Sequence, residues 1–116
     1  MSSEVIPMID EITLAKMSDM LSVASDLTRL KILACLLGDE FFANHKKTDA
    51  PRVELSVSEI VEKTGASQSL VSHQLKILKN AELVSARRDG RQIFYSLSDE
   101  HVDALIEVVF EHVNEE

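Results

Sequence analysis

The chain has 116 residues, of which 45% are hydrophobic, and a formal net charge of -8. This length allows one domain with a modest core, so stabilisation by a partner chain is expected, and no apolar run approaches the roughly 18 residues of a membrane span. The start, MSSEVIPMIDE, lacks the pattern of a secretory signal, and a single cysteine, Cys35, cannot form an internal disulfide. We therefore expect one cytoplasmic domain, residues 1–116, with no membrane partner.

The charge is distributed unevenly along the chain. Residues 63–91 carry six basic and two acidic side chains, a local charge of +4, which leaves -12 for the rest of the chain. A cationic segment in an anionic body can neutralise phosphates locally, while long-range repulsion keeps nonspecific binding weak. On charge alone, this segment is equally compatible with a nucleic-acid-binding surface and with a basic face that is only solvated. The case for a nucleic-acid partner therefore depends on the elements that carry these charges.

Two helices are predicted before the basic segment. Apolar residues recur at helical spacing over residues 9–23, which predicts the first helix. The second helix begins with Ser25 or Asp26 as its N-cap and ends at Gly38. Residues 39–53 are polar and show no period, so we expect a loop insertion there.

Residues 56–79 are predicted to form a helix-turn-helix. Ser56 and Glu59 have the spacing of a capping box, and Gly65 ends the first of two short helices. A three-residue turn leads to a second helix, whose polar side chains are suited to reading base edges in the major groove of DNA. The residues expected to be exposed on this second helix are Gln68, Ser69, Ser72, His73, Gln74, Lys76 and Lys79.

Residues 83–97 are predicted to form a β-hairpin beside the helix-turn-helix. Asp89 and Gly90 separate two strand-like runs, and a tight primed turn needs positive φ at both of its central residues. The arginines around this turn are Arg87, Arg88 and Arg91. The expected fold is therefore mainly α with a small β-hairpin, a winged helix-turn-helix, and the expected partner is double-stranded DNA.

From about residue 20 onward, except for the insertion, the chain resembles the ArsR/SmtB family of bacterial metal-responsive repressors. The resemblance rests on LTRLKIL in the second helix, on SQSLVSHQLKILK within the helix-turn-helix and on SDEHVDALIEVVFEHVNEE at the end. It implies a homodimeric repressor that dimerises through its terminal helices, about residues 9–23 and 99–115. It also implies that the residues at the DNA surface are Gln68, Ser69, Ser72, His73, Lys76, Arg87, Arg88 and Arg91.

The last helix carries histidines and carboxylates on one face. At 100° per residue, His112 lies about 20° from His101 around the helix axis, and Glu115 lies about 40° to the other side. Eleven residues separate the two histidines by about 16 Å along the axis, whereas the ligands of one zinc ion lie within about 4 Å of each other. One chain therefore cannot close such a site, but two antiparallel copies related by a twofold axis can form two identical sites.

Zinc sensors of the ArsR/SmtB family use this arrangement, and the matching residues here are Asp99, His101, His112 and Glu115. Two imidazoles and two carboxylates suit Zn(II), with Co(II) as a substitute, whereas softer metals prefer thiolates. Ni(II) is a less favoured candidate, because octahedral relatives recruit further ligands from their chain ends. The resemblance also implies an allosteric contact, in which the second ring nitrogen of a metal-bound His112 donates to the backbone carbonyl of Glu82.

These observations lead to the hypothesis of a metal-responsive repressor. The apo dimer binds operator DNA, and Zn(II) binding at the last helix weakens that binding, which derepresses metal-homeostasis genes. The alternative is a winged-helix regulator that responds to a non-metal signal and uses its last helix only for dimerisation. An enzyme and a small organic substrate are not expected, because the four ligands leave no open coordination position and the sequence shows no nucleophile motif or phosphate-binding loop.

Overall fold

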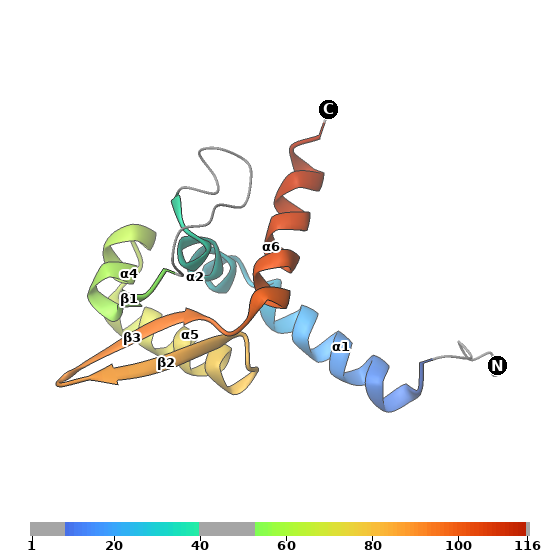
Figure 1. Ribbon diagram of the computed structural model, residues 1–116, viewed down its shortest axis with the longest axis horizontal. Helices are drawn as coiled ribbons and strands as arrows, with labels where there is room; N and C mark the ends of the chain where they lie inside the picture. The colour runs from blue at the N-terminus through green and yellow to red at the C-terminus, as the bar shows by residue number, and fades with distance from the viewer. Residues whose placement is uncertain (1–8, 40–52, 116) are drawn as a thin grey trace.

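The structure is a computed structural model that describes residues 9–39 and 53–115, and Figure 1 shows how its elements are arranged. The predicted insertion at 39–53 lies almost entirely outside the described residues. Within them, the elements are α1 (Glu11–Ala24), α2 (Leu27–Leu37), β1 (Leu55–Ser56), α4 (Val57–Thr64), α5 (Gln68–Asn80), β2 (Val84–Asp89), β3 (Gln92–Leu97) and α6 (Glu100–Val113). This order of elements is that of a winged helix-turn-helix, as the sequence predicts.

Local hydrogen bonds explain where the helices begin and end. The side chain of Asp26 accepts from the backbone N–H of Arg29 at 3.1 Å, so Asp26 is the N-cap of α2. Ser56 and Glu59 form the predicted capping box, since each side chain accepts from the backbone N–H of the other residue. Gly65 ends α4 in the left-handed conformation with φ 76°, which the absence of a side chain makes accessible.

The core lies between α2, the helix-turn-helix and the base of the sheet. Its fully buried side chains come from α2, α4, α5 and the residue just before β2, and the largest are Ile32, Leu33, Ile60, Val71, Leu75, Leu78 and Leu83. The three inward residues of α5 recur at spacings of three and four, so the opposite face of this helix is turned to solvent. The core thus fixes which side of α5 is available to a partner.

The wing differs from its prediction in two respects. Asp89 pairs with Gln92, so the central residues of the turn are Gly90 and Arg91 rather than Asp89 and Gly90. Among the described residues of this turn, only Gly90 has positive φ (66°), as in a type II′ turn, so the expectation of two positive φ values was wrong. The short strand β1, which the sequence did not predict, pairs with β3 and gives the antiparallel order β1-β3-β2.

The two terminal helices extend from the body of the molecule in different directions (Figure 1). No residue of α1 is buried, although this helix carries Ile12, Met17, Met20 and Leu21 as exposed large hydrophobic side chains. In α6 only Val102 and Ile106 are buried. None of the helices in the described part of the chain is long and apolar enough to cross a membrane.

Candidate nucleic-acid interface and candidate metal site

The solvent-facing side of α5 carries the polar residues that the sequence singled out. Ser67 caps the helix by accepting from the N–H of Leu70, and the buried Val71, Leu75 and Leu78 orient it on the core. The residues that are exposed as predicted are Gln68, Ser69, Ser72, His73, Lys76 and Lys79. These side chains offer donors and acceptors to base edges and charges to phosphates, but their role in DNA binding stays a prediction at this point.

Gln74 does not belong to this exposed set, which corrects the sequence-based expectation. Its side chain is half-buried, and its amide oxygen accepts from Nη1 of Arg29 on α2 at 2.9 Å. The periodicity of α5 placed Gln74 at the border of the polar face. Its partner lies 45 residues earlier in the chain, so no local signal could identify the contact.

The three wing arginines are in different surroundings. The guanidinium of Arg87 donates to both carboxylate oxygens of Glu54 at 2.8 to 3.2 Å and lies over the ring of Phe94. This pair lowers the pKa of Glu54 and raises that of Arg87, in each case through the hydrogen bonds between them. Arg88 donates to the carbonyl of Gly90, two residues further along the chain, and Arg91 is exposed at the tip of the wing. Sequence reasoning did not find Glu54 as a partner of the predicted DNA-binding Arg87.

The basic segment is thus partly neutralised within the chain. Lys63 forms an ion pair with Asp39 at 2.9 Å, and Arg87 forms one with Glu54 at 2.8 Å. Over residues 9–39 and 53–115, no ion pair engages Lys76, Lys79, Arg88 or Arg91. Lys76 and Lys79 are carried by α5, and Arg88 and Arg91 lie at the tip of the wing, so these positive charges are divided between the recognition-helix candidate and the hairpin.

The predicted metal ligands lie at the two ends of α6. Asp99 is the N-cap of this helix, because its Oδ1 accepts from the backbone N–H groups of His101 at 2.9 Å and Val102 at 3.2 Å. The side chain of His101 is 98% exposed, and its Nδ1 lies 3.6 Å from Oδ1 of Asp99. His112 and Glu115, at the other end, are also exposed. The structure therefore brings Asp99 and His101 together but leaves them apart from His112 and Glu115.

No group of three or more metal-ligating side chains lies together in the described part of the chain. On one helix the two pairs of predicted ligands lie about 16 Å apart along the axis, so they are too distant to meet within a single chain. The donor chemistry nevertheless fits a zinc ion. The two backbone N–H groups that donate to Asp99 both use its Oδ1, which leaves Oδ2 for a metal ion. The imidazoles of His101 and His112 are both exposed to solvent.

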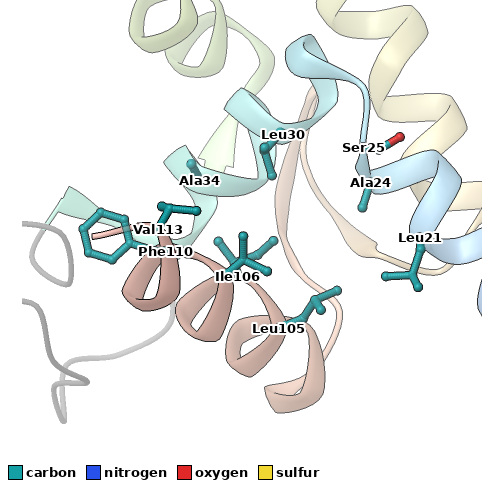
Figure 2. Close-up of a pocket in the computed structure, with 10 residues that line it drawn as sticks. Leu21, Ala24, Ser25, Leu30, Ala34, Leu105, Ile106, Phe110 and Val113 are labelled. Carbon is teal, nitrogen blue, oxygen red and sulfur yellow. The ribbon is translucent and has the colours of Figure 1, made fainter. Parts of the chain in front are cut away.

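An apolar cavity of about 380 Å³ separates α6 from α1 and α2. Figure 2 shows the side chains of Leu21, Ala24 and Leu30 on one side of it and those of Leu105, Ile106 and Phe110 on the other. Most of the large hydrophobic side chains that are exposed among the described residues lie on α1 and α6. These side chains and the cavity form one apolar region around the terminal helices.

The carbonyl of Glu82 lies where α5 meets the wing. Glu82 has positive φ (63°), and its carbonyl accepts from the hydroxyl of Ser98 at 2.8 Å. Ser98 directly precedes Asp99, so Glu82 lies at the beginning of α6, whereas His112 lies near the end of that helix. Within one chain the predicted contact between His112 and the Glu82 carbonyl is therefore out of reach.

Comparison with known proteins agrees with the fold. Residues 52–86 match the family model described as bacterial regulatory protein, arsR family. The transcriptional repressor SmtB homolog of Synechocystis sp. is 35% identical over 100 residues, which make up 86% of this chain and 65% of that protein. The HTH-type transcriptional regulator NmtR of Mycobacterium tuberculosis is 47% identical over 58 residues, which make up 50% of this chain and 48% of that protein.

Among solved structures, HlyU from Vibrio cholerae aligns with a TM-score of 0.71 at 31% identity, over 90% of this chain and 98% of that one. The chain thus spans less than two thirds of the two curated relatives but nearly all of HlyU. Its fold is that of a winged helix-turn-helix protein. The chain belongs to the arsR family of bacterial regulatory proteins, whose members are transcriptional regulators rather than enzymes.

Proposed function

We propose that the protein is a homodimeric, DNA-binding transcriptional repressor that releases its operator when Zn(II) binds at the ends of α6. The observation that carries this proposal is the arrangement of α6. Its exposed face has a pair of metal-ligating residues at each end and apolar residues between them. A second copy of the chain can complete the metal site and cover the apolar residues at the same time.

The second copy is supported by the apolar surface of the terminal helices. Leu21 on α1 and Val109 on α6 are about half exposed although both line the apolar cavity. Burial of such residues contributes roughly 25 cal/mol per Å² of apolar surface removed from water. A chain of this size gains much of its stability in that way. Dimerisation through α1 and α6 therefore accounts for hydrophobic residues that the single chain leaves in water.

The register of an antiparallel α6 pair can be derived from residue numbers. If His101 of one chain lies beside His112 of the other, the twofold axis passes between residues 106 and 107. The same axis places Leu105 beside Val108 of the partner subunit. Leu105 and Val108 lie within about 40° of His101 around the helix, and Val108 is 62% exposed in the single chain. One register thus brings together both the ligands and the apolar residues between them.

The proposed ligands of each site are Asp99 and His101 of one subunit with His112 and Glu115 of the other. Zn(II) supplies a dipositive charge and a preference for four-coordinate binding by such groups. The residues themselves then hold the two α6 helices in one relative position. Because binding and DNA release are linked, DNA must weaken metal affinity by the same factor.

The antiparallel arrangement also gives a route from the ligands to the DNA-binding surface. It brings His112 of the partner subunit to the beginning of α6, where the carbonyl of Glu82 lies beside Ser98. A carbonyl oxygen has two lone pairs, so it can accept from Ser98 and from an imidazole N–H. The predicted contact between His112 and Glu82 is therefore proposed as an intersubunit hydrogen bond.

DNA binding is supported by the exposed polar face of α5 and by Lys76, Lys79, Arg88 and Arg91, which form no ion pair with any residue that the structure describes. A dimer would present two such faces to successive major grooves about 34–36 Å apart. Two relatives, the transcriptional repressor SmtB homolog of Synechocystis sp. and the transcriptional regulator NmtR of Mycobacterium tuberculosis, agree with this role.

The alternative is a regulator that responds to a non-metal signal. One observation favours it, because the capping role of Asp99 accounts for this residue without any metal. The two functions differ in whether the other three ligands matter for DNA release.

The test is fluorescence anisotropy with a palindromic duplex from the DNA upstream of the protein's own coding sequence. One Zn(II) per protomer, compared with chelator, is expected to weaken binding tenfold or more, about 1.4 kcal/mol of coupling. His101→Ala should abolish the response and keep the apo affinity, whereas Glu111→Gln, on a neighbouring face of α6, should behave as the wild type. Tight DNA binding that zinc leaves unchanged would establish the alternative, and failure to bind any duplex at low salt would reject both.

A further inference from the structure

Arg29 makes a set of contacts that neither the DNA-binding surface nor the metal site explains. It lies in the first turn of α2, where its backbone N–H donates to the capping side chain of Asp26. Its Nε donates to the carbonyl of Val23, in the last turn of α1, at 2.8 Å. Its Nη1 donates to the amide oxygen of Gln74, in the middle of α5, at 2.9 Å. One side chain thus connects three helices.

The contact with Val23 is important because α1 has few other attachments to the body. No residue of α1 is buried. The last carbonyls of a helix lack partners within it, and a guanidinium that satisfies one of them fixes where the helix ends. The planar guanidinium holds its donors in a fixed relative direction, so the Val23 and Gln74 bonds together define the orientation of α1 relative to α5.

Gln74 lies on the recognition helix directly after the exposed Ser72 and His73 and before the buried Leu75. A shift of Gln74 would therefore turn the exposed face of α5 as well. In the proposed dimer, α1 belongs to the interface and α5 reads the DNA. The Arg29 contacts are the hydrogen-bonded connection between these two helices.

We propose that Arg29 is a positioning residue that sets the orientation of the recognition helix relative to the dimer interface, and so determines which spacing of operator half-sites the dimer accepts. This inference rests on the proposed function as a dimeric DNA-binding protein. It does not depend on the metal site. A rigid connection makes the dimer selective, because inserting one base pair moves a half-site by about 3.4 Å and rotates it by about 35°.

The test begins with selection of duplexes by the wild-type protein from a random-sequence pool, followed by anisotropy titrations with chelator present. Three duplexes are compared: the selected palindrome and two versions with one base pair added or removed between the half-sites. The wild type is expected to prefer the selected spacing tenfold or more. In Arg29→Met and in Gln74→Leu, which remove the donor and the acceptor, this preference should fall below threefold.

Two controls separate positioning from a general loss of structure. Lys31→Met removes an exposed cation from the same helix and should keep the full preference. Gln74→Glu keeps an acceptor for Arg29, so this variant should also keep the preference for the selected spacing. Its added negative charge would lower the affinity for all three duplexes equally. The double variant Arg29→Met with Gln74→Leu should show no further loss, because both changes break the same contact.

Destabilised protein would bind all three duplexes less well by the same factor, which leaves the preference unchanged. An unchanged preference in both Arg29→Met and Gln74→Leu, with dimers confirmed by sedimentation, would overturn the proposal. If the wild type selects no palindromic duplex, the proposed function fails and this inference fails with it. If it does select one, dimeric DNA binding, the part of the proposed function on which this inference rests, stands whatever the Arg29 variants show.

Discussion

At the scale of single residues, Cys35 shows how burial changes the chemistry of a side chain. Its thiol is half-buried beside the core and donates to the carbonyl of Ile32 at 3.2 Å. Burial raises the pKa of this thiol to about 11 from an ordinary value of 9.0, although Lys63 nearby acts in the opposite direction. Cys35 is therefore protonated at neutral pH and is expected to be a poor nucleophile.

The raised pKa has a defined effect on stability. Between pH 9 and pH 11 the folded chain binds more protons at Cys35 than the unfolded chain, so the free energy of unfolding should fall as the pH rises through this range. Below pH 9 this contribution should be constant. Urea titrations of the wild type and of Cys35→Ala at several pH values would measure it, and an equal decline in both proteins would contradict the assignment to Cys35.

At the scale of elements, the ion pair between Arg87 and Glu54 connects strand β2 of the wing to the residue that directly precedes β1. Both side chains are partly exposed, so the pair contributes little to folding stability, but it competes with any phosphate for the same guanidinium. Glu54→Gln should therefore strengthen DNA binding. It should also steepen the dependence of log affinity on log salt by up to about 0.9 for each Arg87 that gains a phosphate.

The matched control for the wing is Glu11→Gln, which removes the same charge from the first residue of α1. The N-terminal end of this helix lies away from the wing (Figure 1). A salt dependence that is equal in the Glu54 and Glu11 variants would mean that Arg87 does not reach the DNA. In that case its role would be to hold the wing against β1, and the phosphate contacts would come from Arg88 and Arg91.

At the scale of the whole molecule, the proposed dimer places Val108 near its twofold axis. Val108→Lys would place two positive charges close together in an apolar seam. An uncompensated buried charge costs about 3–5 kcal/mol, enough to weaken the dimer more than a hundredfold. Sedimentation equilibrium should then show a species near the chain mass of 12.9 kDa, rather than twice that mass for the wild type.

Glu111→Lys is the control for this prediction, since it adds the same side chain to an exposed position on a neighbouring face of α6. It should leave the dimer intact. A stable Val108→Lys dimer would show that the α6 helices do not pair in the register that joins His101 to His112 of the partner subunit.

Much of the fold could be predicted because its determinants are local in the chain. The capping box of Ser56 and Glu59 spans three residues, and Gly65 ends α4 through its own backbone conformation. The predicted exposure of Ser72, His73 and Lys76 followed from the period of the helix. The pattern from Asp99 to Glu115 could likewise be recognised on one helix, although its role in metal binding is still a proposal.

The sequence by itself determined the helices, the N-caps of α2 and α4, the presence of the hairpin and most of the exposed face of α5, because hydrogen bonds and periodicities within a few residues specify these features. Only the tertiary structure decided that Arg87 pairs with Glu54, 33 residues away, and that Arg29 contacts both Val23 and Gln74, the latter 45 residues beyond Arg29. It also placed the wing turn at Gly90 and Arg91 and added β1 to the sheet. Such contacts depend on which segments the core brings within hydrogen-bonding distance, and no local pattern contains that information.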